Sequence, residues 1–476
     1  MEEGISSCAT LRVFLDIQHH PESQVRDTPT LHRHLTGKIH ISVLESHRRW
    51  VDGLLSRSRS KEHISLDPVL TNFKTFLKDN PEIEQLANDM WTEFPITPPY
   101  NQDPDGLIPQ VRSVEDMFAA INQVLTECPR WYTIKDAKAV EFIGAPMSAI
   151  LNWAMGTESG YHFFTNPEVN THWQAVLHKW KGFLESPASF PNDPEKNKWT
   201  SAEALEILTK AGDGTNGFTF TELYRCPDPS NPHTLGFPSW DTFFTREFQP
   251  NQRPLASLTD KLPSKLSIRD PSQLITHACE STPYNLAHNV QLHATFWLKS
   301  QPYSLAEMLH SEAIAGPFAN GTVYQAYLSA LTYHRWHAPV SGTVTHIELV
   351  AGTFYSQNMY CGFKNPLGPD PVAPLASQAY LAEVATRGMI TIQADNPKIG
   401  LMAMVFIGMG EVSSCDFFVR EGETVEQGQQ IGTFHYGGSS HCLVFRPETR
   451  LVFEDPGPYV DEDVNKGVMS LLAVAL

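Results

Sequence analysis

The sequence has no apolar run long enough to cross a bilayer as a helix, which takes about 20 residues. The longest candidate, residues 400–410 (GLMAMVFIGMG), is too short and predicts a buried strand instead. The N-terminus has no basic segment followed by an apolar one, so it resembles neither a secretory signal nor a transit peptide. We therefore expect no integral membrane segment and a cytoplasmic location.

Cysteine and positive charge are also scarce. The 7 cysteines are scattered over 476 residues without a CxxC pair, which argues against a disulfide framework or a zinc ribbon. The sequence has only 35 Lys and Arg but 53 Asp and Glu, which gives a net charge of −18. This balance argues against a nucleic-acid partner and against a polybasic contact with anionic lipids. The hydrophobic fraction of 41% is ample for a core, and the length fits roughly two or three domains.

After a tail over residues 1–34, the sequence predicts a helical N-terminal domain over residues 35–190. Apolar side chains recur there at three- and four-residue steps, the spacing of one helix face. The segments with this pattern are 67–94, 114–125 and 173–184. Asp67 and Pro68 favour a helix start, because aspartate caps free N–H groups and proline fits the first turn. We interpret these stripes as core, since no chemically useful side chains gather in this half at short spacing.

The pattern changes in the second half of the chain. Residues 191–235 are rich in Pro, Ser and Asn and predict a linker region. Over residues 236–476, short apolar segments alternate with turn residues, as β-strands do. The clearest strands are 342–350, 389–394 and 401–407, and a surface loop is expected at 365–374. The fold class is therefore α+β, with the helical domain followed by a β-rich domain.

Three short segments of the β-rich domain carry the candidate chemistry. Tyr333–Pro339 (YHRWHAP) holds His334 and His337, and His277–Ser281 (HACES) holds Glu280. Acid, histidine and serine are the parts of an activated-nucleophile triad. Each segment is weak by itself, because a His-x-x-His pair without the glutamate of HExxH is more often structural than a metal site.

The serine comes from the third segment, Phe434–His441 (FHYGGSSH). A pair of glycines lets the backbone bend at little steric cost, so the Ser439 hydroxyl can reach the carbonyl of Gly438. This is the local arrangement of a self-cleaving Gly–Ser bond. The flanking His435 and His441 are interpreted as ordinary strand residues, and His277 as a residue that could line the same cavity as Glu280.

These segments resemble the phosphatidylserine decarboxylase family of pyruvoyl-dependent enzymes. The matching segments are Phe243–Arg246, Arg253–Pro254, Leu298–Leu305, Gly321–Val323, Tyr333–Pro339 and Gly438–Ser440. Within the family, the ACES, YHRWHAPV, VFIGM and GGSS segments are most similar to a soluble fungal branch that includes the L-tryptophan decarboxylase of psilocybin biosynthesis. The helical domain is similar to the extra domain of that branch, although more loosely.

The resemblance implies a role for each site residue. Ser439 would cleave the Gly438–Ser439 bond by an N-to-O acyl shift and become the pyruvoyl cofactor. A β-chain, 1–438, and an α-chain, 439–476, would stay associated. His337 matches the base of processing and Glu280 its triad acid, where lipid-decarboxylating members have an aspartate. His334 matches the histidine that handles the substrate carboxylate during decarboxylation. Neither pyridoxal phosphate nor a metal is expected.

The substrate class stays open between a free amino acid and a lipid. The acidic composition and the lack of an anchor favour a free L-amino acid, with tryptophan or another aromatic residue first by resemblance and a role in secondary metabolism. Decarboxylation of phosphatidylserine is the alternative, and a non-processing paralogue with a binding role is another. Residues 412–434 also resemble a biotinyl or lipoyl hairpin, but no lysine lies between Arg420 and His441 to carry such a group.

Overall fold

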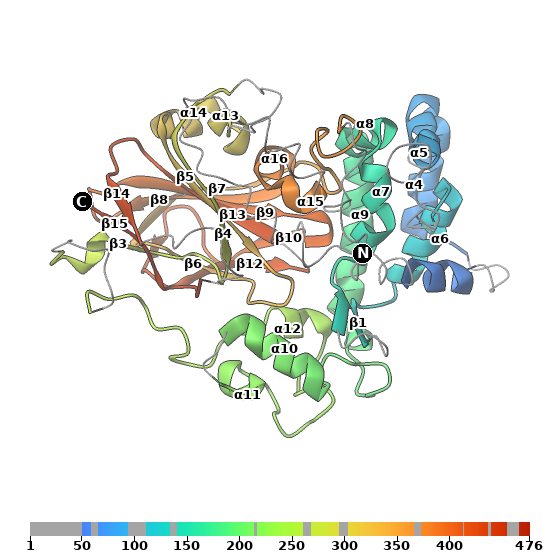
Figure 1. Ribbon diagram of the computed structural model, residues 1–476, viewed down its shortest axis with the longest axis horizontal. Coiled ribbons are helices and arrows are strands. Elements are labelled where there is room, and N and C mark those ends of the chain that lie inside the picture. The colour runs from blue at the N-terminus through green and yellow to red at the C-terminus, as the bar shows by residue number, and fades with distance from the viewer. Residues whose placement is uncertain are drawn as a thin grey trace, which may run out of the picture.

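The computed structural model has a helical part at one end and a β-rich part at the other (Figure 1). The described residues are 50–58, 65–93, 111–133, 140–213, 217–259, 268–294, 303–365, 373–412, 414–436, 439–454 and 466–476. The helical part comes from the N-terminal half of the sequence and the β-rich part from the C-terminal half, which confirms the α+β fold class.

Within the described residues, the helical part contains amphipathic helices, a further helical stretch over residues 50–58 and one short hairpin. The helices are α4 (Pro68–Asp79), α5 (Pro81–Glu93), α6 (Val114–Val124), α7 (Pro146–Met155), α8 (Glu158–Thr165) and α9 (Pro167–Leu184), and the hairpin pairs β1 (Arg130–Thr133) with β2 (Val140–Ile143). Among the described residues, none of the helices combines the length and the apolar character that a bilayer crossing needs.

The predicted start of the first helix is confirmed, but its length is not. The Asp67 side chain accepts a hydrogen bond from the Val69 N–H, and Pro68 occupies the first turn. The stripe expected over residues 67–94 is split into α4 and α5 at Asn80, because Pro81 has no N–H to continue the helical ladder.

Residues 191–235, predicted as a linker, carry helical structure. They contain α10 (Ala202–Asp213) and α11 (Phe220–Leu223), and α12 (Trp240–Phe244) follows. These three helices pack below the sheets in Figure 1, between the helical part and the β-rich part. The many Pro, Ser and Asn residues of this segment favour a loop prediction, but such residues also serve as caps and first-turn residues of short helices.

In the residues that the structure describes, the β-rich part contains three antiparallel sheets. A seven-stranded sheet has the order β11-β7-β8-β9-β13-β5-β4, and the smaller sheets have the orders β10-β12-β6 and β14-β15-β3. The strands are β3 (Leu274–Thr276), β4 (Thr282–Val290), β5 (Gly321–Leu328), β6 (Arg335–His337), β7 (Gly342–Val350), β8 (Arg387–Ala394), β9 (Leu401–Gly408), β10 (Ser414–Phe417), β11 (Thr424–Val425), β12 (Gln430–His435), β13 (Ser439–Phe445), β14 (Leu451–Phe453) and β15 (Leu471–Ala475). The strands predicted at 342–350, 389–394 and 401–407 are confirmed. Residues 366–372 of the expected loop lie outside the described residues.

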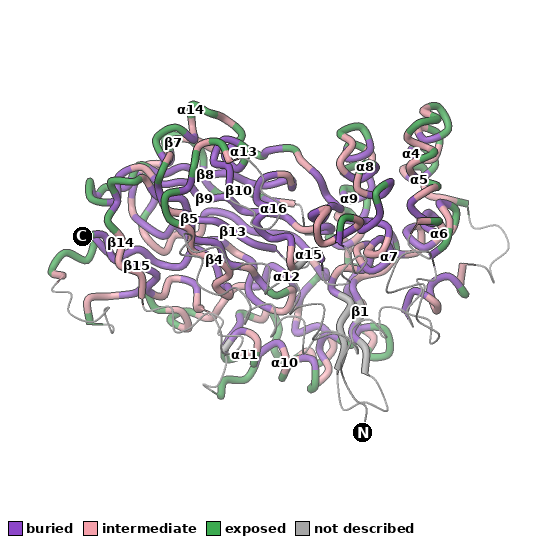
Figure 2. The backbone as a smooth tube through the Cα atoms, turned by 45° about the horizontal axis from the view of Figure 1, so that its top comes forward, coloured by how far each residue is buried: buried purple, intermediate pink, exposed green. Residues whose placement is uncertain are grey.

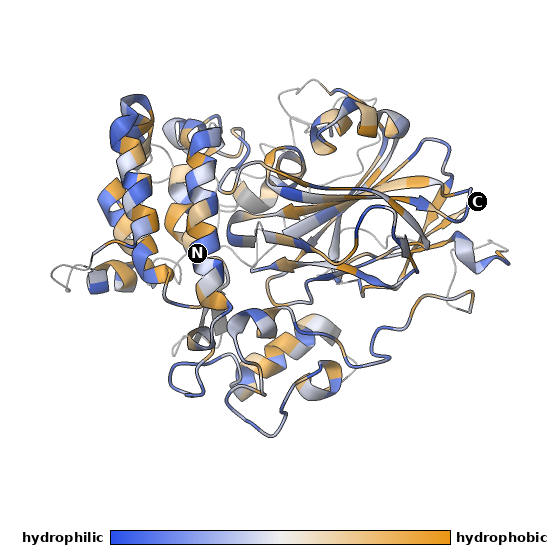
Figure 3. Cartoon of the chain, turned by 180° about the vertical axis from the view of Figure 1, so that it is seen from behind, coloured by the Kyte–Doolittle hydropathy of each residue, from blue (hydrophilic) through white to orange (hydrophobic). Residues whose placement is uncertain are grey.

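The central strands β8, β9 and β13 of the seven-stranded sheet are buried on both faces. Figure 2 draws these central strands largely in purple, and Figure 3 shows apolar residues along them. One face packs on β6 and β12, where the Trp336 and Phe406 rings stack with centroids 3.8 Å apart. The other face packs on α13 (Leu305–Met308) and α16 (Gln378–Val384). Burial on both faces explains why β9 reads as one continuous apolar run rather than an alternating one.

The helical and β-rich parts share one hydrophobic core. Trp173 on α9 is fully buried, and its ring lies 4.8 Å from that of Tyr355, which follows β7. Glu411, which follows β9, is also buried and accepts hydrogen bonds from the backbone N–H and the hydroxyl of Ser148 on α7, at 2.8 and 2.7 Å. The helical part is therefore fixed against the sheet.

We expect Trp173→Ala to lower the free energy of unfolding by about 3–5 kcal/mol, because it leaves a cavity in this shared core. Urea unfolding would be followed in a Ser439→Ala background, which cannot form the ester needed for cleavage. Leu349→Ala, at a side chain that is 50% exposed, is the control and should change stability by less than about 0.5 kcal/mol. Equal effects of the two changes would contradict a shared core.

Candidate active site

His334 and Ser439 lie where the chain passes between two paired sheets. Strands β5 and β13 pair in the seven-stranded sheet, whereas β6 and β12 pair in a smaller one. β5 ends at Leu328 and β6 begins at Arg335, while β12 ends at His435 and β13 begins at Ser439. Ser439 pairs with Leu328 at one end, and the Phe434 N–H donates to the His334 carbonyl at the other, at 3.0 Å. His334 and Ser439 therefore share one corner of the fold. Gly438 lies outside the described residues.

Ser439 is the first residue of β13 and is 1% exposed. Its neighbours across the sheet are Gly408 on β9 and Leu328 on β5. Within the described part of the chain its hydroxyl has no hydrogen-bond partner. Buried polar groups are nearly always paired, so an exception needs an explanation, and a nucleophile is one. A pyruvoyl group made from this residue fits the site, since neighbouring strands on both sides would enclose it.

α12 and the residues that follow it contact the chain segment that carries His334. The His334 ring is fully buried and stacks on Phe244, with centroids 4.1 Å apart. The Arg246 guanidinium donates to the Leu331 carbonyl at 2.8 Å and lies 4.3 Å from the centre of the Tyr224 ring. The Phe243–Arg246 motif therefore positions the crossing that carries His334.

His337 is buried as a neutral imidazole. Its Nδ1 lies 2.7 Å from the Gly428 carbonyl and its Nε2 lies 2.8 Å from the Tyr333 hydroxyl. Since a carbonyl can only accept, Nδ1 carries the proton and Nε2 accepts from Tyr333. Burial lowers the pKa of His337 to about 4, although the Gly428 hydrogen bond opposes it. Tyr333, to which the sequence alone assigns no role, therefore contacts the nitrogen that a base would use.

Glu280 is 1% exposed and forms an ion pair with Arg253. Arg253 Nη2 and Nε lie 2.7 and 3.1 Å from the two carboxylate oxygens, and the Val468 N–H donates to the same carboxylate at 2.8 Å. The His337 N–H binds the Ala278 carbonyl at 2.9 Å, which brings the two segments together. The side-chain contacts of His337 given above are nevertheless to Tyr333 and Gly428, so its pairing with Glu280 stays a prediction.

A second pair of histidines, His277 and His441, is buried in the β-rich part. His441 shares a strand face with Ser439, because side chains two apart on a strand point the same way. His441 is fully buried, and neither ring nitrogen has a hydrogen-bond partner among the described residues. The Nδ1 of His277 lies 3.5 Å from the Tyr324 hydroxyl, and the Tyr324 ring centre lies 6.2 Å from that of His441. Burial lowers the pKa of His277 and His441 to about 3 each.

Comparisons with known proteins agree with this arrangement. Models of the phosphatidylserine decarboxylase family match residues 67–208 and 240–467. The chain belongs to the phosphatidylserine decarboxylase family. As a member of this family it is a carboxy-lyase, and the family is pyruvoyl-dependent. Within the described ranges, no group of three or more His, Cys, Asp or Glu side chains could hold a metal ion.

The relatives of this decarboxylase include amino-acid and lipid enzymes. Decarboxylase iboD of Amanita muscaria is 38% identical over 66% of this chain and 87% of its own length. The L-tryptophan decarboxylase of Psilocybe cubensis is 30% identical over 88% of this chain and 89% of its own. Phosphatidylserine decarboxylase proenzyme 3 of Schizosaccharomyces pombe is 26% identical over 46% of this chain and 20% of its own. The iboD and L-tryptophan decarboxylase matches are therefore longer than the β-rich part alone and extend into the rest of the chain. The match to the lipid enzyme covers less of the chain.

We expect the decarboxylase to lose about 3–5 kcal/mol of stability on either Glu280→Gln or Arg253→Met, because each change removes one partner of a buried ion pair. The double variant should lose less than the sum, since it leaves no unpaired charge. Urea unfolding of the three variants in the Ser439→Ala background would measure this coupling. Losses that add within about 0.5 kcal/mol would show that the pair is not coupled.

Acid should weaken the fold through His441, whose ordinary pKa is 6.5 and whose folded pKa is about 3. Between these values the unfolded chain binds a proton that the folded chain excludes. The stabilising effect of keeping His441 neutral is complete above pH 6.5 and is lost as the pH falls. Relative to His441→Phe, the Ser439→Ala protein should lose up to about 1.4 kcal/mol per pH unit in this window.

The matched control for that measurement is Phe406→Leu, a change in the same core without a titratable group. Its difference from the parent should stay constant over the same pH range. A His441→Phe difference that is equally constant would mean that His441 is not kept neutral by burial.

Proposed function

We propose that the protein is a self-processing, pyruvoyl-dependent decarboxylase of a free L-amino acid, and that tryptophan or another aromatic amino acid is its substrate. The Gly438–Ser439 bond is cut to give a β-chain, 1–438, and an α-chain, 439–476, which begins with the pyruvoyl group. The helical part over residues 35–190 and the catalytic part over residues 236–476 act as one enzyme in the cytoplasm.

The observation that carries the proposal is the buried hydroxyl of Ser439, which has no hydrogen-bond partner among the residues that the structure describes. Ser439 starts a strand directly after Gly438 and shares a corner with His334. An unpartnered hydroxyl is free to attack the carbonyl that precedes it. Its enclosure by β5 and β9 keeps water from competing with that attack.

The roles proposed for the other residues come from the resemblance to the family. His337 serves as the base of cleavage when Tyr333 releases its Nε2, and Glu280 is the acid of this triad. His334, stacked on Phe244, holds the substrate carboxylate near the start of β13. The pyruvoyl group supplies an electron sink for the pair that is released with CO2. Burial around the site favours loss of the charged carboxylate.

A free amino acid is preferred over a lipid for two reasons. The relatives from Psilocybe named L-tryptophan decarboxylase match 88% and 87% of this chain, including the helical part, whereas the lipid decarboxylases cover about half or less. The net charge of −18 also opposes binding to an anionic bilayer surface. Phosphatidylserine stays the alternative substrate, and a non-processing paralogue with a binding role is a further alternative.

We expect denaturing mass spectrometry of the fresh protein to give two species that divide between Gly438 and Ser439, with a pyruvoyl mass on the smaller one. Ser439→Ala should remain a single chain. Ser440→Ala is the matched control and should still be cut. Glu280→Gln and His337→Gln should be cut at least about tenfold more slowly, because a general base typically contributes about 10²–10⁴-fold. Unimpaired cleavage of Glu280→Gln would remove Glu280 from processing.

The substrate is tested separately on the cleaved enzyme. Release of CO2 and of the matching amine would be measured with L-tryptophan, other aromatic amino acids, aliphatic amino acids and vesicles that contain phosphatidylserine. Turnover of tryptophan or another aromatic amino acid alone would support the proposal. Turnover of the vesicles alone would select the lipid alternative, and a single uncut chain would select the non-processing paralogue.

A further inference from the structure

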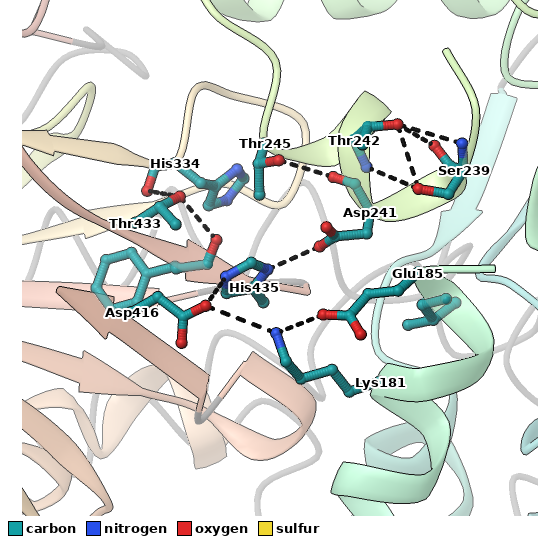
Figure 4. A network of polar contacts seen from close by, with 12 residues as sticks. Lys181, Glu185, Ser239, Asp241, Thr242, Thr245, His334, Asp416, Thr433 and His435 are labelled. Atoms are coloured by element: carbon teal, nitrogen blue, oxygen red, sulfur yellow. Dashed lines mark hydrogen bonds and ion pairs between the residues drawn. The ribbon is translucent and has the colours of Figure 1, made fainter. Parts of the chain in front are cut away.

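The residue four positions before Ser439 is held by two carboxylates from different elements. His435 Nδ1 lies 2.7 Å from Oδ1 of Asp241 on α12, and its Nε2 lies 2.9 Å from Oδ2 of Asp416 on β10 (Figure 4). The His435 side chain is only 8% exposed. The sequence predicts only a strand residue at His435, because its partners Asp241 and Asp416 lie far from it along the chain.

Both contacts require His435 to carry a positive charge. A carboxylate can only accept hydrogen bonds, so each ring nitrogen must donate, and a ring that donates from both is an imidazolium. Burial opposes the charge, but the hydrogen bonds to Asp241 and Asp416 outweigh it and raise the pKa of His435. The same pairing lowers the pKa of Asp416. We name this Asp241–His435–Asp416 arrangement the imidazolium clamp.

The clamp reaches the helical part of the protein. Lys181 on α9 lies 3.7 Å from the Asp416 carboxylate and 2.9 Å from that of Glu185, which caps the same helix. The next residue along the chain, Tyr436, is 1% exposed, and its ring centre lies 5.7 Å from those of Trp180 on α9 and Trp240 on α12. Two consecutive residues are therefore anchored to helices just before the cleavage turn.

The backbone at Tyr436 is strained. Its φ is 66°, in the left-handed region that bulky side chains seldom enter. Such conformations persist only where the surroundings fix the residue, and they occur at functional sites. Here the fixed surroundings are the aromatic cluster around the Tyr436 ring and the clamp on His435.

We propose that His435 is a positioning residue for self-cleavage, whose imidazolium clamp fixes the segment before the Gly438–Ser439 bond to α9 and α12. This inference rests on the proposed function and assigns part of the processing machinery to the helical part. The hydrogen bonds of the clamp given above are to Asp241 and Asp416 and not to Ser439. The clamp acts by holding His435 and Tyr436 in place, from which the glycine pair of the sequence leads directly to the Gly438–Ser439 bond.

The clamp gives cleavage a characteristic dependence on pH. The charged groups that surround His435 are Asp241 on α12, Asp416 on β10, and Lys181 and Glu185 on α9. Because the pKa of His435 is raised, the clamp is complete below its ordinary range and is lost as the pH rises through the raised value. Cleavage of the unsubstituted chain should therefore slow on the alkaline side.

The test is a time course of cleavage during cell-free synthesis of the full chain, read on a denaturing gel over a range of pH. His435→Gln should be cut roughly ten- to a hundredfold more slowly and should lack the alkaline fall. Asp241→Asn keeps the shape of the clamp but removes one charge, so it should move the alkaline fall to lower pH by about one unit. His346→Gln is the matched control, because His346 on β7 also lies between two carboxylates, those of Glu348 and Glu421.

The outcomes separate the clamp from the proposed function. If the unsubstituted chain is not cut at all, the proposed function fails. If it is cut, and His435→Gln is cut at the same rate or retains the same alkaline fall, the clamp is wrong. Circular dichroism of each change in the Ser439→Ala background checks folding. Should His435→Gln not fold, the pH shift of Asp241→Asn decides alone, and an unshifted profile overturns the inference.

Discussion

The structure depends on the pairing of β13 with a strand on each side. From Ser439 to Phe445, every residue of β13 is in register with β5 on one side and with β9 on the other. A strand held in this way cannot shift without breaking both ladders. The position of its first residue, Ser439, is therefore fixed by the sheet. A strained backbone conformation can then occur only in the chain before this strand. This is where Tyr436 takes up its left-handed conformation.

Buried charge is paired in the same region, although the chain is acidic overall. Glu280 is paired with Arg253, and His435 is paired with Asp241 and Asp416. An isolated buried charge is costly, so each of these groups requires its partner to be in place. The partners come from segments that are distant in sequence. The ion pairs therefore specify how α12, the chain near Arg253 and the sheets meet, and not only how strongly they hold together.

Local chemistry could be predicted from the sequence, whereas long-range pairing could not. The cap at Asp67 and the strand β9 follow from rules that act within a few residues, and the structure confirms them. The fold class follows from the apolar patterns of the two halves, and the family follows from the short motif segments of the β-rich domain. The break at Pro81 was missed because the apolar stripe continues through it, and the helices α10 and α11 were missed because their flanks are rich in turn residues.

The contacts of the candidate site show the same division. Its histidines and serine are recognisable as motifs, but the contact of Tyr333 with His337 and the ion pair of Glu280 with Arg253 depend on tertiary packing.

The central position of β13 in the seven-stranded sheet has a further consequence. A chain cut at Ser439 would keep its fold, because β13 would stay paired with β5 and β9. Once unfolded, the two chains would have no covalent link, and neither contains the partner strands that the other supplies. The mature enzyme would then persist because it unfolds slowly, and its useful lifetime would be a rate rather than an equilibrium.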